Sequence, residues 1–184
     1  MKLRTSALLT AAAIALTACG PKAQTNVATT DTSVTNDATV VAPSADQSFA
    51  NAAASSDAFE IAAAKLALTN SSSASIKKFA QMMIDGHTES TGKLQAAAGS
   101  ATPAITPDPT LTADQQEKLA ALQALKGADF DKAYAAGQVG AHEMTLATLK
   151  AYSANGAVPQ LKAFATELVP IVTAHLNMAK GLKV

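Results

Sequence analysis

Residues 74–98 read ASIKKFAQMMIDGHTESTGKLQAAA, and their apolar side chains recur at the three- and four-residue intervals of one helix face. The stretch therefore predicts a helix of about seven turns, closed by Gly99. The stripe on its inner face consists of Ile76, Ala80, Met83, His87, Thr91 and Leu94.

The same spacing predicts four further helices, at about 47–69, 112–126, 128–155 and 159–182. A serine in 71–73 can cap the second helix, Thr112 to Gln115 form a capping-box pattern, and Pro159 suits a first helical turn. Two helical hairpins joined by a longer, proline-containing crossover describe an all-α, ferritin-like four-helix bundle, whose crossover contains one short extra helix.

Packing details follow from the stripes. On the last helix we expect an inner stripe of Leu161, Phe164, Leu168, Ile171, His175, Met178 and Leu182. On the preceding helix, Gly137 and Gly140 favour a close helix approach over a ligand site. Pro170 lies inside the last helix and favours a bend that fits the bundle over a kink that aims His175 inward.

Composition excludes several classes of protein. Hydrophobic residues make up 48% of the chain and half of them are alanine, while Trp is absent. This composition argues strongly against an all-β sandwich. The formal net charge is zero, and Arg4 is the single arginine. Nucleic-acid binding requires a dense basic face, and we therefore expect no nucleic-acid partner.

The first 18 residues have the pattern of a lipoprotein signal peptide, with Lys2 and Arg4 before an apolar run and small residues. Leu16, Thr17 and Ala18 precede Cys19 as in a bacterial lipoprotein cleavage box, and Cys19 is the only cysteine of the chain. The pattern predicts lipidation at Cys19 and anchoring in a membrane. Because Gly20 and not an aspartate follows, we expect the outer membrane, facing the periplasm.

Residues 19–46 carry the lipidated cysteine and then a stretch rich in Thr, Asn and Ala that lacks aromatic residues, Leu, Ile and Met. Such a stretch buries too little apolar surface to offset its ordering entropy, and we expect a disordered tether. The folded domain is predicted at 47–184.

Three histidines, the only ones in the chain, fall on three different predicted helices: His87, His142 and His175. On the first helix, Glu60 interrupts a stripe of small residues, and a buried carboxylate needs a partner. Counted from the turn between the first two helices, Glu60 and His87 are offset by about 7 Å along the helix axis. The same count from the last turn gives a similar offset of about 7 Å between His142 and His175, and side-chain reach can close much of both offsets. Glu60, His87, His142 and His175 are therefore candidate ligands for zinc, copper or iron.

A structural role for these histidines is the competing interpretation. A core histidine can be satisfied by a hydroxyl or a backbone carbonyl, and Tyr134, Tyr152, Thr145 and Thr148 are available partners. A di-iron enzyme is disfavoured, since that chemistry uses a carboxylate three residues before each histidine. Those positions hold Ile84, Val139 and Val172.

Several ordered motifs together resemble domain-of-unknown-function family 4142. They are Phe59 to Ala62, Ile76 to His87, Asp129 to Tyr134 with His142, and Leu168 to Pro170 with His175. The resemblance implies a bacterial envelope protein with a ferritin-like bundle and carries no established activity. Gly86 stands where an acidic residue is expected before the histidine.

Three functions remain open from the sequence. The first is a non-enzymatic, lipid-anchored helical module of the envelope that binds a transition-metal ion. The second is a metal-dependent redox enzyme of the ferritin-like class. The third is a structural or stress-linked envelope protein that binds other proteins.

Overall fold

The computed structural model describes residues 42–184, which form five helices and, within that range, no strand. The helices are α1 (Ala45–Asn70), α2 (Ala74–Gly99), α3 (Ala113–Gln123), α4 (Gly127–Asn155) and α5 (Pro159–Lys180). The prediction of an all-α fold is confirmed. The predicted signal peptide, Cys19 and most of the predicted tether lie outside the described residues, and α1 begins at Ala45, just inside the end of the predicted tether.

Local sequence signals set the helix ends. The side chain of Ser73 accepts a hydrogen bond from the backbone of Ile76 and starts α2, as predicted. Thr112 and Gln115 form a complete capping box before α3. Pro159 occupies the first turn of α5, where its missing N–H costs nothing.

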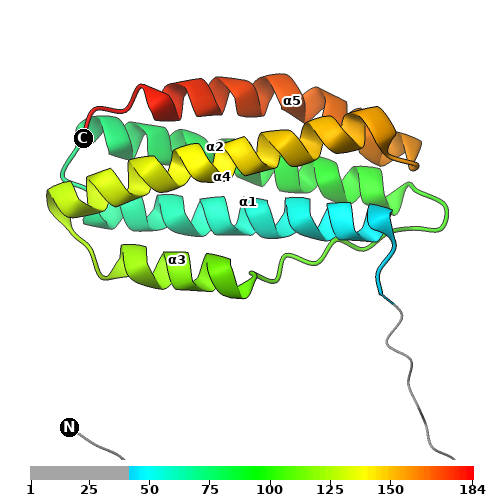
Figure 1. Cartoon of the computed structure of the whole chain (residues 1–184), viewed down its shortest axis with the longest axis horizontal. Helices are drawn as coiled ribbons and strands as arrows, with labels where there is room; N and C mark the ends of the chain where they lie inside the picture. Colours follow the sequence, from blue (N-terminus) through cyan, green and yellow to red (C-terminus); the bar gives the residue numbers. More distant parts are fainter. Residues whose placement is uncertain (1–41) are drawn as a thin grey trace, which may run out of the picture. The chain divides into compact units, whose positions relative to one another are not determined.

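The four long helices lie side by side (Figure 1). α1 packs against α2 and α4, and α5 packs against the same two helices. Short turns join α1 to α2 and α4 to α5, whereas the chain between α2 and α4 runs back along the helices through α3. α3 lies on the outside, against α1 and α4.

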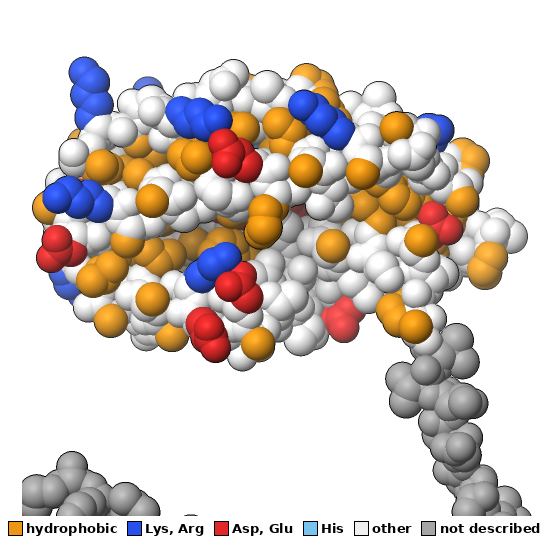
Figure 2. All heavy atoms as spheres, viewed as in Figure 1, with side chains coloured by type: hydrophobic (Ala, Val, Ile, Leu, Met, Phe, Trp, Pro, Cys, Tyr) orange, Lys and Arg blue, Asp and Glu red, His pale blue; other side chains and the backbone are white. Residues whose placement is uncertain are grey.

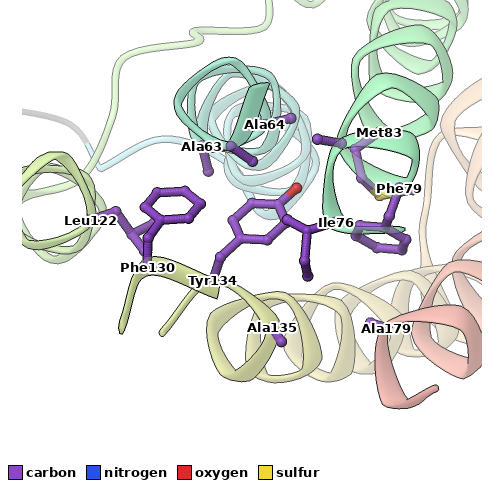
Figure 3. Packing of buried hydrophobic residues seen from close by; sticks show 12 residues of the cluster. Ala63, Ala64, Ile76, Phe79, Met83, Leu122, Phe130, Tyr134, Ala135 and Ala179 are labelled. Carbon is purple, nitrogen blue, oxygen red and sulfur yellow. The ribbon is translucent and has the colours of Figure 1, made fainter. Parts of the chain in front are cut away.

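Two clusters of buried hydrophobic side chains fill the interior. The Tyr134 cluster, drawn in Figure 3, includes Ala63, Ile76, Phe79, Met83, Phe130, Tyr134 and Ala179. The Phe164 cluster includes Phe49, Leu94, Leu149, Leu161, Phe164, Leu168 and Val172. Each of the four long helices contributes to both clusters, so each helix crosses the zone between them.

Two packing expectations are wrong. Ile171 and Met178 are exposed, because the buried face of α5 runs through Leu168, Val172, His175 and Ala179 and leaves both residues off the stripe. Gly137 and Gly140 do not mediate a close helix approach, since nothing lies within 4 Å of a Cβ placed at either position.

Candidate metal centre

A layer of buried polar side chains separates the two hydrophobic clusters. On every long helix these residues lie between the contributions to the Tyr134 cluster and the Phe164 cluster. No side chain of the layer is more than 8% exposed: Asp57 and Glu60 on α1, His87 on α2, Gln138 and His142 on α4, and His175 on α5. Burying so many polar groups together is costly unless they have partners.

The three histidines meet within this layer. One ring nitrogen of each of His87, His142 and His175 lies within 4.8 Å of the other two. The three ring centroids are 5.7, 5.8 and 5.7 Å apart, so the rings form a nearly equilateral triangle. The reach of the side chains therefore closes the offset of about 7 Å between His142 and His175 that residue counting predicts.

His87 is held by a carboxylate. Its Nδ1 lies 2.8 Å from Oδ1 of Asp57, and because a carboxylate oxygen accepts, Nδ1 carries the proton. The neutral ring then has its lone pair on Nε2, which is buried and has no hydrogen-bond partner among the described residues. This is the arrangement by which proteins orient a metal-binding imidazole.

His142 is held in the same way by a backbone carbonyl. Its Nδ1 donates to the carbonyl oxygen of Gln138 over 2.8 Å, and its buried Nε2 has no partner in the described part of the chain. Nδ1 of His175 is also buried and, within residues 42–184, unpartnered.

The hydroxyls proposed as structural partners of the histidines are engaged elsewhere or unpaired. Tyr152 donates to Asp46, Thr145 pairs with Ser56, and Thr148 donates to the carbonyl of Met144. The hydroxyl of Tyr134 is buried and has no partner among residues 42–184. Hydrogen bonding therefore accounts for one nitrogen of His87 and one of His142, and leaves the other nitrogen of each ring, and Nδ1 of His175, without a partner in residues 42–184.

Glu60 lies beside the histidine group and is not a member of it. Its Oε2 accepts a hydrogen bond from Nε2 of Gln138 at 2.6 Å, and its Oε1 is 3.9 Å from Nδ1 of His142. That nitrogen is the one already bonded to a carbonyl, so the carboxylate is on the outer side of the His142 ring. The structure thus brings three of the four candidate ligands together and places the fourth behind them.

Burial and the neighbouring carboxylates together set the charges of the layer. It lowers the pKa of His142 and of His175 to about 4, so both rings are neutral at pH 7. Burial also acts against a charge on His87, but the hydrogen bond to Asp57 and the carboxylates of Glu60 and Asp57 outweigh it, and the pKa of His87 is raised. Burial raises the pKa of Glu60 to about 7, against the opposing charge of His87.

Two residues of the layer, Asp57 and Gln138, were not identified from the sequence. Asp57 is three residues before Glu60 and Gln138 four before His142, and both spacings place a side chain on the same helix face. These intervals were the available signal, since a polar pair on an inner stripe points to a hydrogen-bonded partner.

A small cavity adjoins the histidines. Its volume is about 20 Å³, room for about one water molecule, and Asp57, Gly86, His87 and His175 are among the residues that line it. A Cβ at Gly86 would lie 3.2 Å from Cε1 and 3.5 Å from Nε2 of His175. Gly86 therefore provides the space in which the His175 ring lies.

The family profile described as Domain of unknown function (DUF4142) matches residues 29–182, and the chain belongs to this family. No curated protein matches the chain in sequence. Among solved structures, CopM in the Cu(I)-bound form is 19% identical, with 76% of this chain and 95% of that chain covered and a TM-score of 0.62. CopM in the Cu(II)-bound form is 17% identical, with 74% and 93% covered and the same TM-score of 0.62. At these identities the similarity shows a shared fold.

Proposed function

We propose that this member of domain-of-unknown-function family 4142 binds one transition-metal ion between His87, His142 and His175, and holds it without catalysing a reaction. One observation carries the proposal: three buried imidazole nitrogens converge within 4.8 Å. Leaving a buried polar atom unpaired costs about 1–3 kcal/mol. A cation bound by all three nitrogens removes that cost.

The donor set fits such an ion. Two of the three rings present a fixed Nε2 lone pair, because Nδ1 is bonded to Asp57 or to the carbonyl of Gln138. Three nitrogens bound to one ion at about 2.0 Å lie about 3.5 Å apart in a trigonal arrangement. Side-chain movements that shift the ring nitrogens by about 1 Å bring the present spacing to that value. A water in the adjoining cavity supplies a fourth ligand.

Copper is the ion that we propose, ahead of zinc and iron. Imidazole suits all three metals, and the affinity of nitrogen sites for divalent ions peaks at Cu²⁺. Support comes from the two CopM structures, which share the fold and are described as Cu(I)-bound and Cu(II)-bound.

We further propose that the four long helices form a ferritin-like bundle. In support, α1 pairs with α2 and α4 with α5, and one long crossover through α3 returns the chain so that α2 and α4 run in the same direction (Figure 1). The polar layer then lies near the middle of the bundle, where proteins of this architecture hold metals.

For the cellular setting we propose a lipid anchor at Cys19 in the outer membrane, with the domain in the periplasm. Support comes from the cleavage-box residues before this single cysteine. Among the helices of residues 42–184, none has the length and apolar character that crossing a bilayer requires.

Titration of the metal-stripped full chain with Cu(II), and with Cu(I) under reducing conditions, tests the proposal. A chromophoric chelator competes with the protein for the ion and reports the affinity. We expect one ion per chain, and at least a tenfold loss of affinity in each of His87→Gln, His142→Gln and His175→Gln. Glu143→Gln, an exposed change next to His142, is the control and should bind like the wild type. Absence of stoichiometric binding, or full affinity in all three histidine variants, would refute the site.

A further inference from the structure

A second hollow, outside the polar layer, lies between α3 and the pair α1 and α4. Its volume is about 790 Å³, within the range of about 300–1,000 Å³ typical of small-molecule sites. Figure 2 shows hydrophobic side chains in the hollow between α3 and α4. We name it the α3 groove, and its lining includes Ala52, Phe59, Leu122, Ala133, Gly137 and Met144.

The groove is wide because α3 stands off the long helices. Leu122 is the only residue of α3 that is buried. A hydrogen bond from Nε2 of Gln115 to the carbonyl of Ser55, 3.3 Å long, fixes α3 to α1. On the opposite wall, Gly137 and Gly140 have nothing within 4 Å of an added Cβ. Both glycines therefore widen the groove and do not serve helix packing.

The lining defines an elongated apolar space. On α4 it extends from Ala133 to Leu149, sixteen residues apart, which corresponds to about 24 Å along the helix. Met144 lines the groove with 61% of its surface exposed, a state that an apolar ligand would relieve. A long and narrow ligand fits this space better than a compact one.

Charge and hydrogen bonding restrict the ligand further. Among the described residues that line the groove, the charged ones are Asp114 and Lys118, both on α3, and they pair with each other at 2.7 Å. An extended peptide must pair its buried backbone N–H and C=O groups, and the described part of the chain contains no strand whose edge could pair with them. An unbranched hydrocarbon chain has no such requirement.

We propose that the α3 groove binds a long-chain fatty acid, with the hydrocarbon along α4 and the carboxylate at Lys118. Lys118 is the one cation among the described lining residues, and its bond to Asp114 is an exposed helical pair that contributes little to stability. Its ammonium can therefore turn to a ligand carboxylate at small cost. The proposal does not depend on a bound metal.

The test uses the full chain with Cys19→Ala, which carries no lipid of its own, purified without detergent. The probe is a fluorescent 16-carbon fatty acid, displaced by saturated fatty acids of 8 to 16 carbons. We expect one saturable site, with affinity falling about fourfold for each methylene removed, since every buried CH₂ group contributes about the same amount to the binding free energy. Lys118→Ala should weaken binding of the acid and leave that of the corresponding alcohol unchanged.

Gly137→Leu and Gly140→Leu place a side chain in the groove without a clash and should each lower affinity at least tenfold. Gly92→Leu is the matched control, because Gly92 is an exposed helical glycine on α2 with equally open surroundings. Circular dichroism verifies that each variant is folded. If only one of the two groove variants folds, its affinity alone tests the proposal. The proposal would be overturned if no saturable binding of the fatty acid were found, or if Gly92→Leu lost as much affinity as the groove variants. It would also be overturned if the protein bound phosphatidylglycerol vesicles but not palmitate, or captured an amphipathic helical peptide that palmitate does not displace.

Discussion

Asp57 and His87 form a buried pair between α1 and α2, in which the carboxylate Oδ1 and the imidazole Nδ1 are 2.8 Å apart. The hydroxyl of Thr91, one turn beyond His87, donates to the carbonyl oxygen of His87 over 2.9 Å and also lies 3.3 Å from the second oxygen of Asp57. The 2.8 Å contact with His87 is thus the stronger of the two contacts that orient the carboxylate. It selects the tautomer of His87 whose buried Nε2 carries the lone pair.

Replacing Asp57 by Asn keeps the shape of this pair and removes its charge. We predict that Asp57→Asn lowers copper affinity by about 10–100-fold, the usual effect of losing a carboxylate behind a metal-binding histidine. Competition with a chromophoric chelator measures the change. Asp85→Asn, an exposed change two residues before His87, should leave the affinity as it is. Equal affinities in the wild type and Asp57→Asn would show that this pair is structural alone.

Gly86 gives the second prediction. In Gly86→Ala the new methyl group would lie 3.2 Å from Cε1 of His175 and displace the ring by a few tenths of an ångström. We expect copper affinity to fall several-fold, while unfolding in urea shows no loss of stability, because alanine favours a helix by about 1 kcal/mol over glycine. A Cβ at Gly92 has no neighbour within 4 Å. Gly92→Ala should therefore raise the free energy of unfolding and leave the copper affinity unchanged. Unchanged affinity in Gly86→Ala would mean that His175 does not bind the ion as placed here.

The third prediction concerns Glu60 and pH. Burial raises its pKa from 4.5 to about 7, so the folded state binds this proton more tightly than the unfolded state. The resulting stability is present below about pH 4.5 and is lost as the pH rises to about 7, a change of about 3 kcal/mol. Glu60→Gln cannot titrate and lacks this loss.

Urea unfolding of the metal-stripped wild type and Glu60→Gln across pH 4–8 measures this effect together with the accompanying change at His87, whose pKa the Glu60 carboxylate helps to raise. The stability of the variant relative to the wild type should increase between about pH 4.5 and pH 7 and level off on either side of that range. Parallel curves would show that the carboxyl of Glu60 titrates normally.

A fourth prediction addresses the anchor. Cys19→Ala should release the protein from the membrane fraction or block its maturation, since the thiol is the proposed site of acylation. Detergent-phase partitioning and the apparent mass of the product measure both effects. A mutant of normal processed size that remains in the detergent phase would exclude lipidation at Cys19.

The helices and the histidine layer follow from the sequence for a simple physical reason. Apolar spacing, caps and prolines are local signals, and His87 and His175 stand on inner stripes. The role of Asp57 could not be read in this way, because its partner is thirty residues away and the choice between Asp57 and Glu60 depends on helix rotation. The prediction of a close helix approach at Gly137 and Gly140 is wrong because the surroundings of both residues depend on how far α3 lies from α4, which no local pattern specifies.

X-ray absorption spectroscopy of the copper-loaded full chain measures the ligands of the ion directly. The three-histidine site predicts a shell of three imidazole nitrogens at about 2.0 Å, with the outer-atom scattering typical of histidine, and the loss of one imidazole in His175→Gln. A shell containing methionine sulfur, or a spectrum unchanged in His175→Gln, would contradict binding between His87, His142 and His175.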